Sequence, residues 1–227
     1  MTVETSYPFG DSIDLSATAS SRDFELLVRV PGWAGGEGGT AELVDSSGAA
    51  TPLTGLNGTL VRVGVAKAHS APLVATLRLL PKLRIEQWAK GGYSVHRGPL
   101  MFSLPITPHF HLVTHHWGTD QMSNDYDTTN ASAWQYALVA DASNPDASLS
   151  FETAGSVSAA PFNRSSWPVV VRATVRPLPG WGLTKNSASE PPPSPACAAS
   201  GACGEAQQVL LVPHGASDLR IGQFPLT

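Results

Sequence analysis

Residues 91–106, with the sequence GGYSVHRGPLMFSLPI, decide the expected fold of this chain. A run of apolar residues bounded by glycine pairs and prolines predicts a buried strand; its members are Val95, Leu100, Phe102 and Leu104. The Gly98-Pro99 pair interrupts the run, and because glycine permits an unusual φ and proline removes a ladder donor, a bend or bulge is expected there. A strand that bends at this point would join two sheets.

Short alternating segments dominate residues 1–106, which we expect to form an antiparallel β-sandwich. The clearest strand begins at Phe24, where apolar and polar side chains alternate up to Val30 before a Pro-Gly turn. Helical periodicity is hard to find. The other strands are expected at 13–18, 41–45, 60–65, 73–79, 83–88 and 94–104.

Residues 107–227 predict a second, smaller β-sandwich packed on the first. The segment 107–130 is expected to be a polar loop, and the segment 186–204, which contains the sequence PPPSP, a mobile insertion loop. The fold class is therefore all-β, with two packed antiparallel β-sandwich units. The strand signals lie at 134–140, 148–152, 169–175, 209–212 and 219–224.

The amino-acid composition argues against a nucleic-acid partner and against a membrane-spanning segment. The chain has 227 residues, with 14 Lys+Arg against 18 Asp+Glu, and only 14% of its residues are charged. No basic stripe is present, which argues against a nucleic-acid partner, and no apolar run approaches the roughly 20 residues of a membrane span. The 21 glycines and 19 prolines suit a chain of many short strands and turns.

Four stretches, in the same order, resemble the glycoside hydrolase family 127 proteins, the β-L-arabinofuranosidase-like family. The most recognisable is HRGPLMFSL at 96–104, which is similar to an RGPL signature of that family. Together the four stretches span nearly the whole chain. The others are TSYPFGD at 5–11 followed by FELLVRVPGW at 24–33, SAWQYAL at 132–138, and LVPHG at 211–215 with LRIGQFP at 219–225.

The resemblance implies a place in a larger enzyme. Family 127 enzymes have an N-terminal α/α barrel in which a zinc-bound cysteine acts as the nucleophile, followed by β-sandwich domains. None of the barrel's catalytic motif matches a position here, so the resemblance implies a non-catalytic C-terminal portion that braces the barrel. It implies no catalytic residue, no metal and no cofactor in this chain, with zinc only in the missing domain. The α/α-barrel domain, in the same or a separate chain, is then the expected partner.

A histidine cluster is the sharpest local feature outside the resemblance. On a strand, His109 and His111 would share one face, a spacing that can hold a metal between two imidazoles. A third ligand could come from His115 or His116, with Asp120 or Asp125. The alternative is a polar, partly exposed loop whose histidines stack or hydrogen-bond, and this alternative is favoured.

Glycoside hydrolases ordinarily use two carboxylates, one as general acid and the other as nucleophile or base. Asp125 and Asp127 could lie on one side of a strand, although such Asp-rich runs are more often solvated turns. The remaining carboxylates that we considered are Asp120, Asp141, Glu86 and Glu152.

Tryptophans supply the remaining candidates, because sugar rings stack on exposed aromatic side chains. Trp117 and Trp167, in polar segments, are the candidate carbohydrate contacts. Trp33, Trp88 and Trp134 are expected to fill the core of a sandwich instead.

The only two cysteines, Cys197 and Cys203, lie in one Pro/Ala/Ser-rich loop, which favours a local disulfide over free thiols. Sequons begin at Asn57, Asn130 and Asn163, and they favour a secreted or extracellular protein. Residues 1–5 lack the basic start and apolar run of a signal peptide.

Three hypotheses follow from these patterns. The first is the non-catalytic portion of a family 127-like glycosidase. The second is a free-standing carbohydrate-binding β protein. The third is a metal-dependent enzyme that uses the histidines of 109–116.

Overall fold

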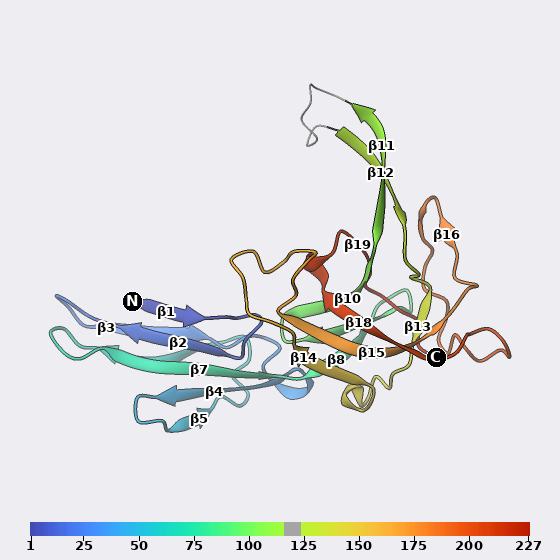
Figure 1. Cartoon of the computed structure of the whole chain (residues 1–227). Helices are drawn as coiled ribbons and strands as arrows, with labels where there is room; N and C mark the ends of the chain where they lie inside the picture. Colours follow the sequence, from blue (N-terminus) through green and yellow to red (C-terminus); the bar gives the residue numbers. More distant parts are fainter. Residues whose placement is uncertain (116–123) are drawn as a thin grey trace. The chain divides into compact units, whose positions relative to one another are not determined.

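The computed structural model describes residues 1–115 and 124–227. The chain divides into two compact units, the first formed by Met1–Arg84 with His96–Leu100 and the second by Ile85–Val95 with Met101–Thr227. Strands make up both units, and the pairs between named strands are antiparallel (Figure 1). The predicted all-β, antiparallel fold is confirmed. In the described part of the chain, no helix has the length and apolar character needed to cross a membrane.

The first unit contains a five-stranded sheet with the order β1-β2-β7-β4-β5 and a separate pair, β3-β6. A short 3-10 turn, Gly36–Gly38, precedes β4. The predicted alternation gives β2 and β7 a buried side and a more exposed side. β1 and β5, which the sequence did not predict, are exposed along their whole length. The bounds are β1 Thr2–Thr5, β2 Ser12–Ala17, β3 Phe24–Arg29, β4 Gly39–Asp45, β5 Ala50–Pro52, β6 Leu60–Ala66 and β7 Leu73–Pro81.

The β3-β6 pair packs on the five-stranded sheet and makes the first unit a two-layer sandwich. Leu15 and Ala17 of β2 lie in one cluster with Leu26 of β3 and Ala66 of β6. A second cluster surrounds Val30, which is fully buried, and its other buried members are Ala34, Ala41, Leu53, Leu77 and Leu79. Burial of such aliphatic side chains contributes about 1.5–3 kcal/mol each.

The stretch 91–106 forms a hairpin instead of one bent strand. β9 (Tyr93–Arg97) and β10 (Leu100–Ile106) are neighbours in one sheet, joined by the two-residue turn Gly98-Pro99. Gly98 has a φ of 55°, and glycine at the first position of a two-residue loop is typical of a type II′ hairpin turn. The expected bend between two sheets is therefore wrong, because the glycine reverses the chain completely.

Because of this hairpin, the boundary between the two units differs from the one that the sequence predicted. We expected the boundary at Ile106, but residues 101–106 belong to the second unit. The reason is strand pairing, because Ser103 lies opposite Val212 of β18 and Leu104 lies opposite Ile221 of β19.

The second unit is built on an eight-stranded sheet with the order β13-β15-β18-β10-β9-β8, to which β14 is added at β15 and β19 at β10. Its interior strand β15 is apolar on both sides over its first three residues, as a strand buried on both faces should be. The bounds are β8 Leu83–Gln87, β13 Tyr136–Leu138, β14 Leu149–Thr153, β15 Val169–Pro177, β18 Gln207–Pro213 and β19 Leu219–Ile221.

Two ribbons complete the second unit. Residues 107–130, expected to be a loop, contain β11 (Pro108–His115) and β12 (Asn124–Asn130), which pair with each other (Figure 1). The expectation failed because polar and aromatic side chains alternate there, a strand pattern on an exposed ribbon. The second ribbon pairs β16 (Leu183–Thr184) with β17 (Ser187–Ala188).

The Pro-rich segment 186–204, expected to be a mobile loop, begins with β17 and makes fixed contacts farther on. The amide of Ala196 donates to the carbonyl of Leu226, and the amide of Leu226 donates to the hydroxyl of Ser194. The amide of Gly204 donates to the carbonyl of Pro177.

Candidate functional site

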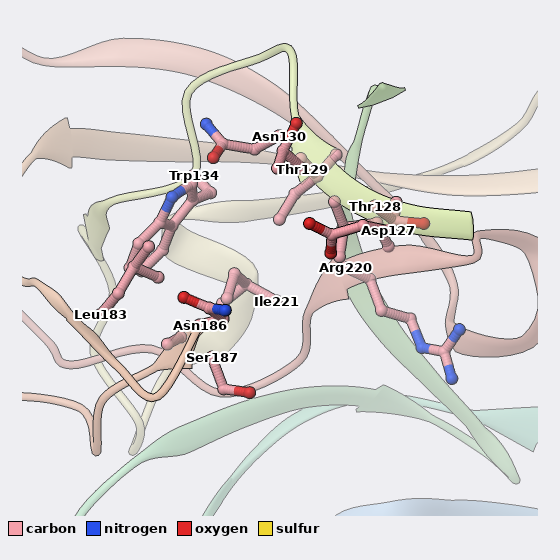
Figure 2. A pocket seen from close by; sticks show the side chains of 13 residues that line it. Asp127, Thr128, Thr129, Asn130, Trp134, Leu183, Asn186, Ser187, Arg220 and Ile221 are labelled. Carbon is pink, nitrogen blue, oxygen red and sulfur yellow. The ribbon is translucent and has the colours of Figure 1, made fainter. Parts of the chain in front are cut away.

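A hollow of about 350 Å³ lies in the second unit (Figure 2). Four segments line it: the last residue of β10, β12 with the loop that follows it, the β16-β17 ribbon, and β19. The lining residues are Ile106, Asp127, Thr128, Thr129, Asn130, Trp134, Leu183, Asn186, Ser187, Ala188, Leu219, Arg220 and Ile221.

Local chain geometry positions the polar groups of this hollow. Asn186 lies in the tight turn between β16 and β17 with a φ of 62°, a left-handed conformation that asparagine tolerates better than most residues. Trp134 is only 5% exposed, and its ring packs edge-on against Trp181 at 5.2 Å between centroids. The tryptophan expected in the core is thus a core residue that also lines the hollow.

The chemistry of the lining suits a neutral, polyhydroxylated ligand. Hydroxyl, amide and carboxylate groups can exchange hydrogen bonds with such a ligand, while the indole of Trp134 supplies an apolar surface. Among these described lining residues, Asp127 is the only carboxylate. The hollow therefore lacks, within its described lining, the two facing carboxylates that glycoside hydrolysis ordinarily uses.

Arg220 is fixed in place by groups next to the hollow. Its Nε–H donates to Nε2 of His214 at 2.9 Å, and Nη1 donates to the carbonyl of Ser217. Nδ1 of His214 in turn lies 2.7 Å from Oγ of Ser103, which is fully buried. The chain of contacts Ser103–His214–Arg220 joins β10, the turn after β18, and β19.

The hydrogen bond between Ser103 and His214 runs in the wrong direction for nucleophilic catalysis, in which the serine would donate to the histidine. Because Nε2 of His214 accepts from the guanidinium, neutral His214 carries its proton on Nδ1 and donates it to Ser103. Burial, reinforced by the positive charge of Arg220, lowers the pKa of His214 and keeps it neutral. The contact thus fastens the strands together, and it does not activate the serine.

The two histidines of β11 are in contact, as either reading allowed, but they lie on a strand and not in the favoured loop. Nδ1 of His109 and Nε2 of His111 are 2.9 Å apart, and their rings are perpendicular with centroids 4.3 Å apart. Within the part of the chain that the structure describes, no group of three or more His, Cys, Asp or Glu side chains is arranged to hold a metal ion. His116 and Asp120 lie outside the described residues.

The candidate carboxylates are dispersed. Asp125 and Asp127 are both on β12, opposite Thr114 and His111 respectively, with a bulge between the two pairings. Asp141 accepts from the amide and the hydroxyl of Ser143, which lower the pKa of its carboxyl group. The last two candidates lie on other strands, Glu86 on β8 and Glu152 on β14.

Of the two tryptophans that were singled out for sugar contact, Trp167 does not line the hollow. Trp167 is partly buried against Val170, Val212 and Ala216, and its buried Nε1 has no hydrogen-bond partner among the described residues. Trp117 lies outside the described residues. Among the lining residues that sequence reasoning missed are Asn186 and Arg220, for which no spacing pattern gave a signal.

The structure joins Cys197 and Cys203 in a disulfide. Of the three sequon asparagines, Asn130 lines the hollow, and its side-chain amide donates to the carbonyl of Ser132. Asn163 accepts from the amides of Ser165 and Ser166, and Asn57 donates to the carbonyl of Gly32.

Comparisons with protein-family models and with curated proteins found no match to this chain. The geometry of its own residues is therefore the basis on which its function has to be argued.

Proposed function

We propose that this chain is the non-catalytic C-terminal β-sandwich portion of a family 127-like β-L-arabinofuranosidase, which braces the catalytic barrel. The supporting observation is that residues of the stretches that resemble family 127 make contacts between segments that are distant in sequence. Arg97 of the HRGPL stretch pairs with Asp11 of the first stretch. Ser103 of the same stretch meets His214 and, through it, Arg220 of the last stretch.

These contacts favour a structural role because they occupy the groups that could otherwise react. A nucleophile needs an accessible oxygen beside a base, whereas Ser103 is buried and accepts from His214. The isolated chain should therefore hydrolyse no glycoside.

The test is an assay with a chromogenic β-L-arabinofuranoside. The purified chain alone should give no turnover above a protein-free control. Co-expression with the helical domain of a family 127 enzyme should give a stable complex that is active and better expressed than the helical domain alone. Turnover by the chain alone that disappears on substitution of one of its residues would overturn the proposal, as would failure of the two proteins to associate.

The hollow favours a second candidate, carbohydrate binding. Its lining combines a carboxylate, amides and hydroxyls with the indole of Trp134, a combination that can satisfy sugar hydroxyls and cover an apolar ring face. This role is compatible with a bracing domain that borders a substrate pocket.

Calorimetric titration with L-arabinose and arabino-oligosaccharides tests this second role. Asp127→Asn and Asn186→Ala should each weaken binding by about tenfold, the loss of one or two hydrogen bonds. Asp146→Asn, an exposed aspartate outside the hollow, is the matched control and should bind as the unaltered chain does. Equal affinities in all three variants would exclude the hollow as the site.

A further inference from the structure

The imidazole pair of β11 has the dimensions of a metal chelate. An imidazole nitrogen binds a first-row divalent ion at about 2.0–2.1 Å, so two such ligands at a right angle lie about 3.0 Å apart. The observed separation between Nδ1 of His109 and Nε2 of His111 is 2.9 Å. One hydrogen now joins the two nitrogens. An ion would lie to one side of the line between them, so each exposed ring would turn its nitrogen toward the ion and the donor ring would carry its proton on its other nitrogen.

The surroundings of the pair suit a cation. Both histidines are exposed, so an ion can reach them from solvent. Oγ1 of Thr129 lies 3.3 Å from Nε2 of His111. Asp127 lies opposite His111 on the paired strand, so its negative charge is on the same face of the ribbon. Asp127 and Thr129 also line the hollow, as Figure 2 shows, so the pair adjoins the hollow's edge.

We propose that His109 and His111 form a bidentate site for Cu²⁺, bound through Nδ1 of the first residue and Nε2 of the second, with water in the remaining positions. Imidazole is a preferred ligand of Cu²⁺, and copper binds a given nitrogen site more tightly than Ni²⁺ or Zn²⁺ does. Two protein ligands fit an ion that accepts a square arrangement, whereas a structural zinc site ordinarily needs four. The site is independent of the proposed accessory role.

The experiment titrates the whole metal-free chain with CuCl₂, monitored by calorimetry and electron paramagnetic resonance. One Cu²⁺ per chain should bind, with a spectrum that shows two equatorial nitrogens. His109→Asn and His111→Asn should each weaken binding by about a hundredfold, since two linked ligands gain roughly 10²–10⁴ over one. The side chains are exposed, so the melting temperature without metal should stay unchanged.

His69→Asn is the matched control, because His69 is exposed, lies in the first unit and has a φ of 57° that asparagine tolerates. It should bind copper as the unaltered chain does. A double variant at 109 and 111 that keeps the affinity and the two-nitrogen spectrum would place the copper elsewhere, for instance on His115 and His116, and would overturn the proposal. So would a chain that binds no copper.

Discussion

Arg97 and Asp11 form a bidentate ion pair between β9 and the segment that precedes β2. Nη1 and Nη2 of the arginine lie 3.0 and 2.8 Å from the two carboxylate oxygens. The Arg97 side chain is 12% exposed and that of Asp11 is 40% exposed. A second arginine serves the neighbouring turn, because Nη1 of Arg84 donates to the Gly98 carbonyl at 2.8 Å.

The Arg97–Asp11 pair should contribute to stability. Arg97→Ala leaves a partly buried carboxylate without its guanidinium partner, so the free energy of unfolding should fall by about 1–3 kcal/mol. Urea unfolding of the two proteins measures the difference. Arg172→Ala is the matched control, because Arg172 makes an equally two-pronged but exposed pair with Glu152 and should cost about 0–1 kcal/mol. Similar losses for both variants would contradict the structural role of Arg97.

The turn between β9 and β10 should require its glycine. Gly98→Ala places a Cβ 3.2 Å from a Pro81 carbon and 3.3 Å from the Trp33 ring, at a φ of 55°. The unfolding free energy should therefore fall by about 1–2 kcal/mol. Gly155→Ala is the control, since a Cβ there meets nothing within 4 Å. An unchanged urea midpoint for Gly98→Ala would show that the turn can relax.

The Cys197–Cys203 disulfide should be detectable and modestly stabilising. The bonded cysteines are separated by six positions, so closure of so short a loop adds only roughly 2 kcal/mol in the chain-entropy model. Intact mass after alkylation without reductant should show no modified cysteine in protein from an oxidising compartment. The Cys197→Ser, Cys203→Ser double variant should unfold at lower urea. Two alkylated thiols in the unreduced protein would refute the bond.

His214 should make stability sensitive to mild acid. Its pKa in the folded chain is lowered from 6.5 by burial and by Arg220, so the unfolded chain binds the proton more readily. This contribution is fully present above pH 6.5 and is lost as the pH falls toward the folded pKa. The melting temperature of His214→Gln should thus change less between pH 7.5 and pH 5.5 than that of the unaltered chain. A parallel profile for His214→Gln would argue against this assignment.

Alternation in the sequence was enough to predict the all-β fold and many of its strands. β3, β7, β15 and β18 lie where apolar and polar or β-branched runs predicted them, because burial of one side of a strand selects residues at a period of two. The isolated cysteine pair likewise pointed to its own disulfide, since both members lie in one short loop. The exposed ribbon β11-β12 was missed because no buried face marks its alternation.

Only the tertiary structure decided which distant groups meet. A period of two says which side of a strand is buried, but it says nothing about which strand lies alongside, so the Gly98-Pro99 turn was mistaken for a bend. The partner of Arg97 is 86 positions away and that of Ser103 is 111 positions away. The hollow, too, takes its polar groups from β12, the β16-β17 turn and β19. These belong to three different sheets, so only tertiary packing brings them together.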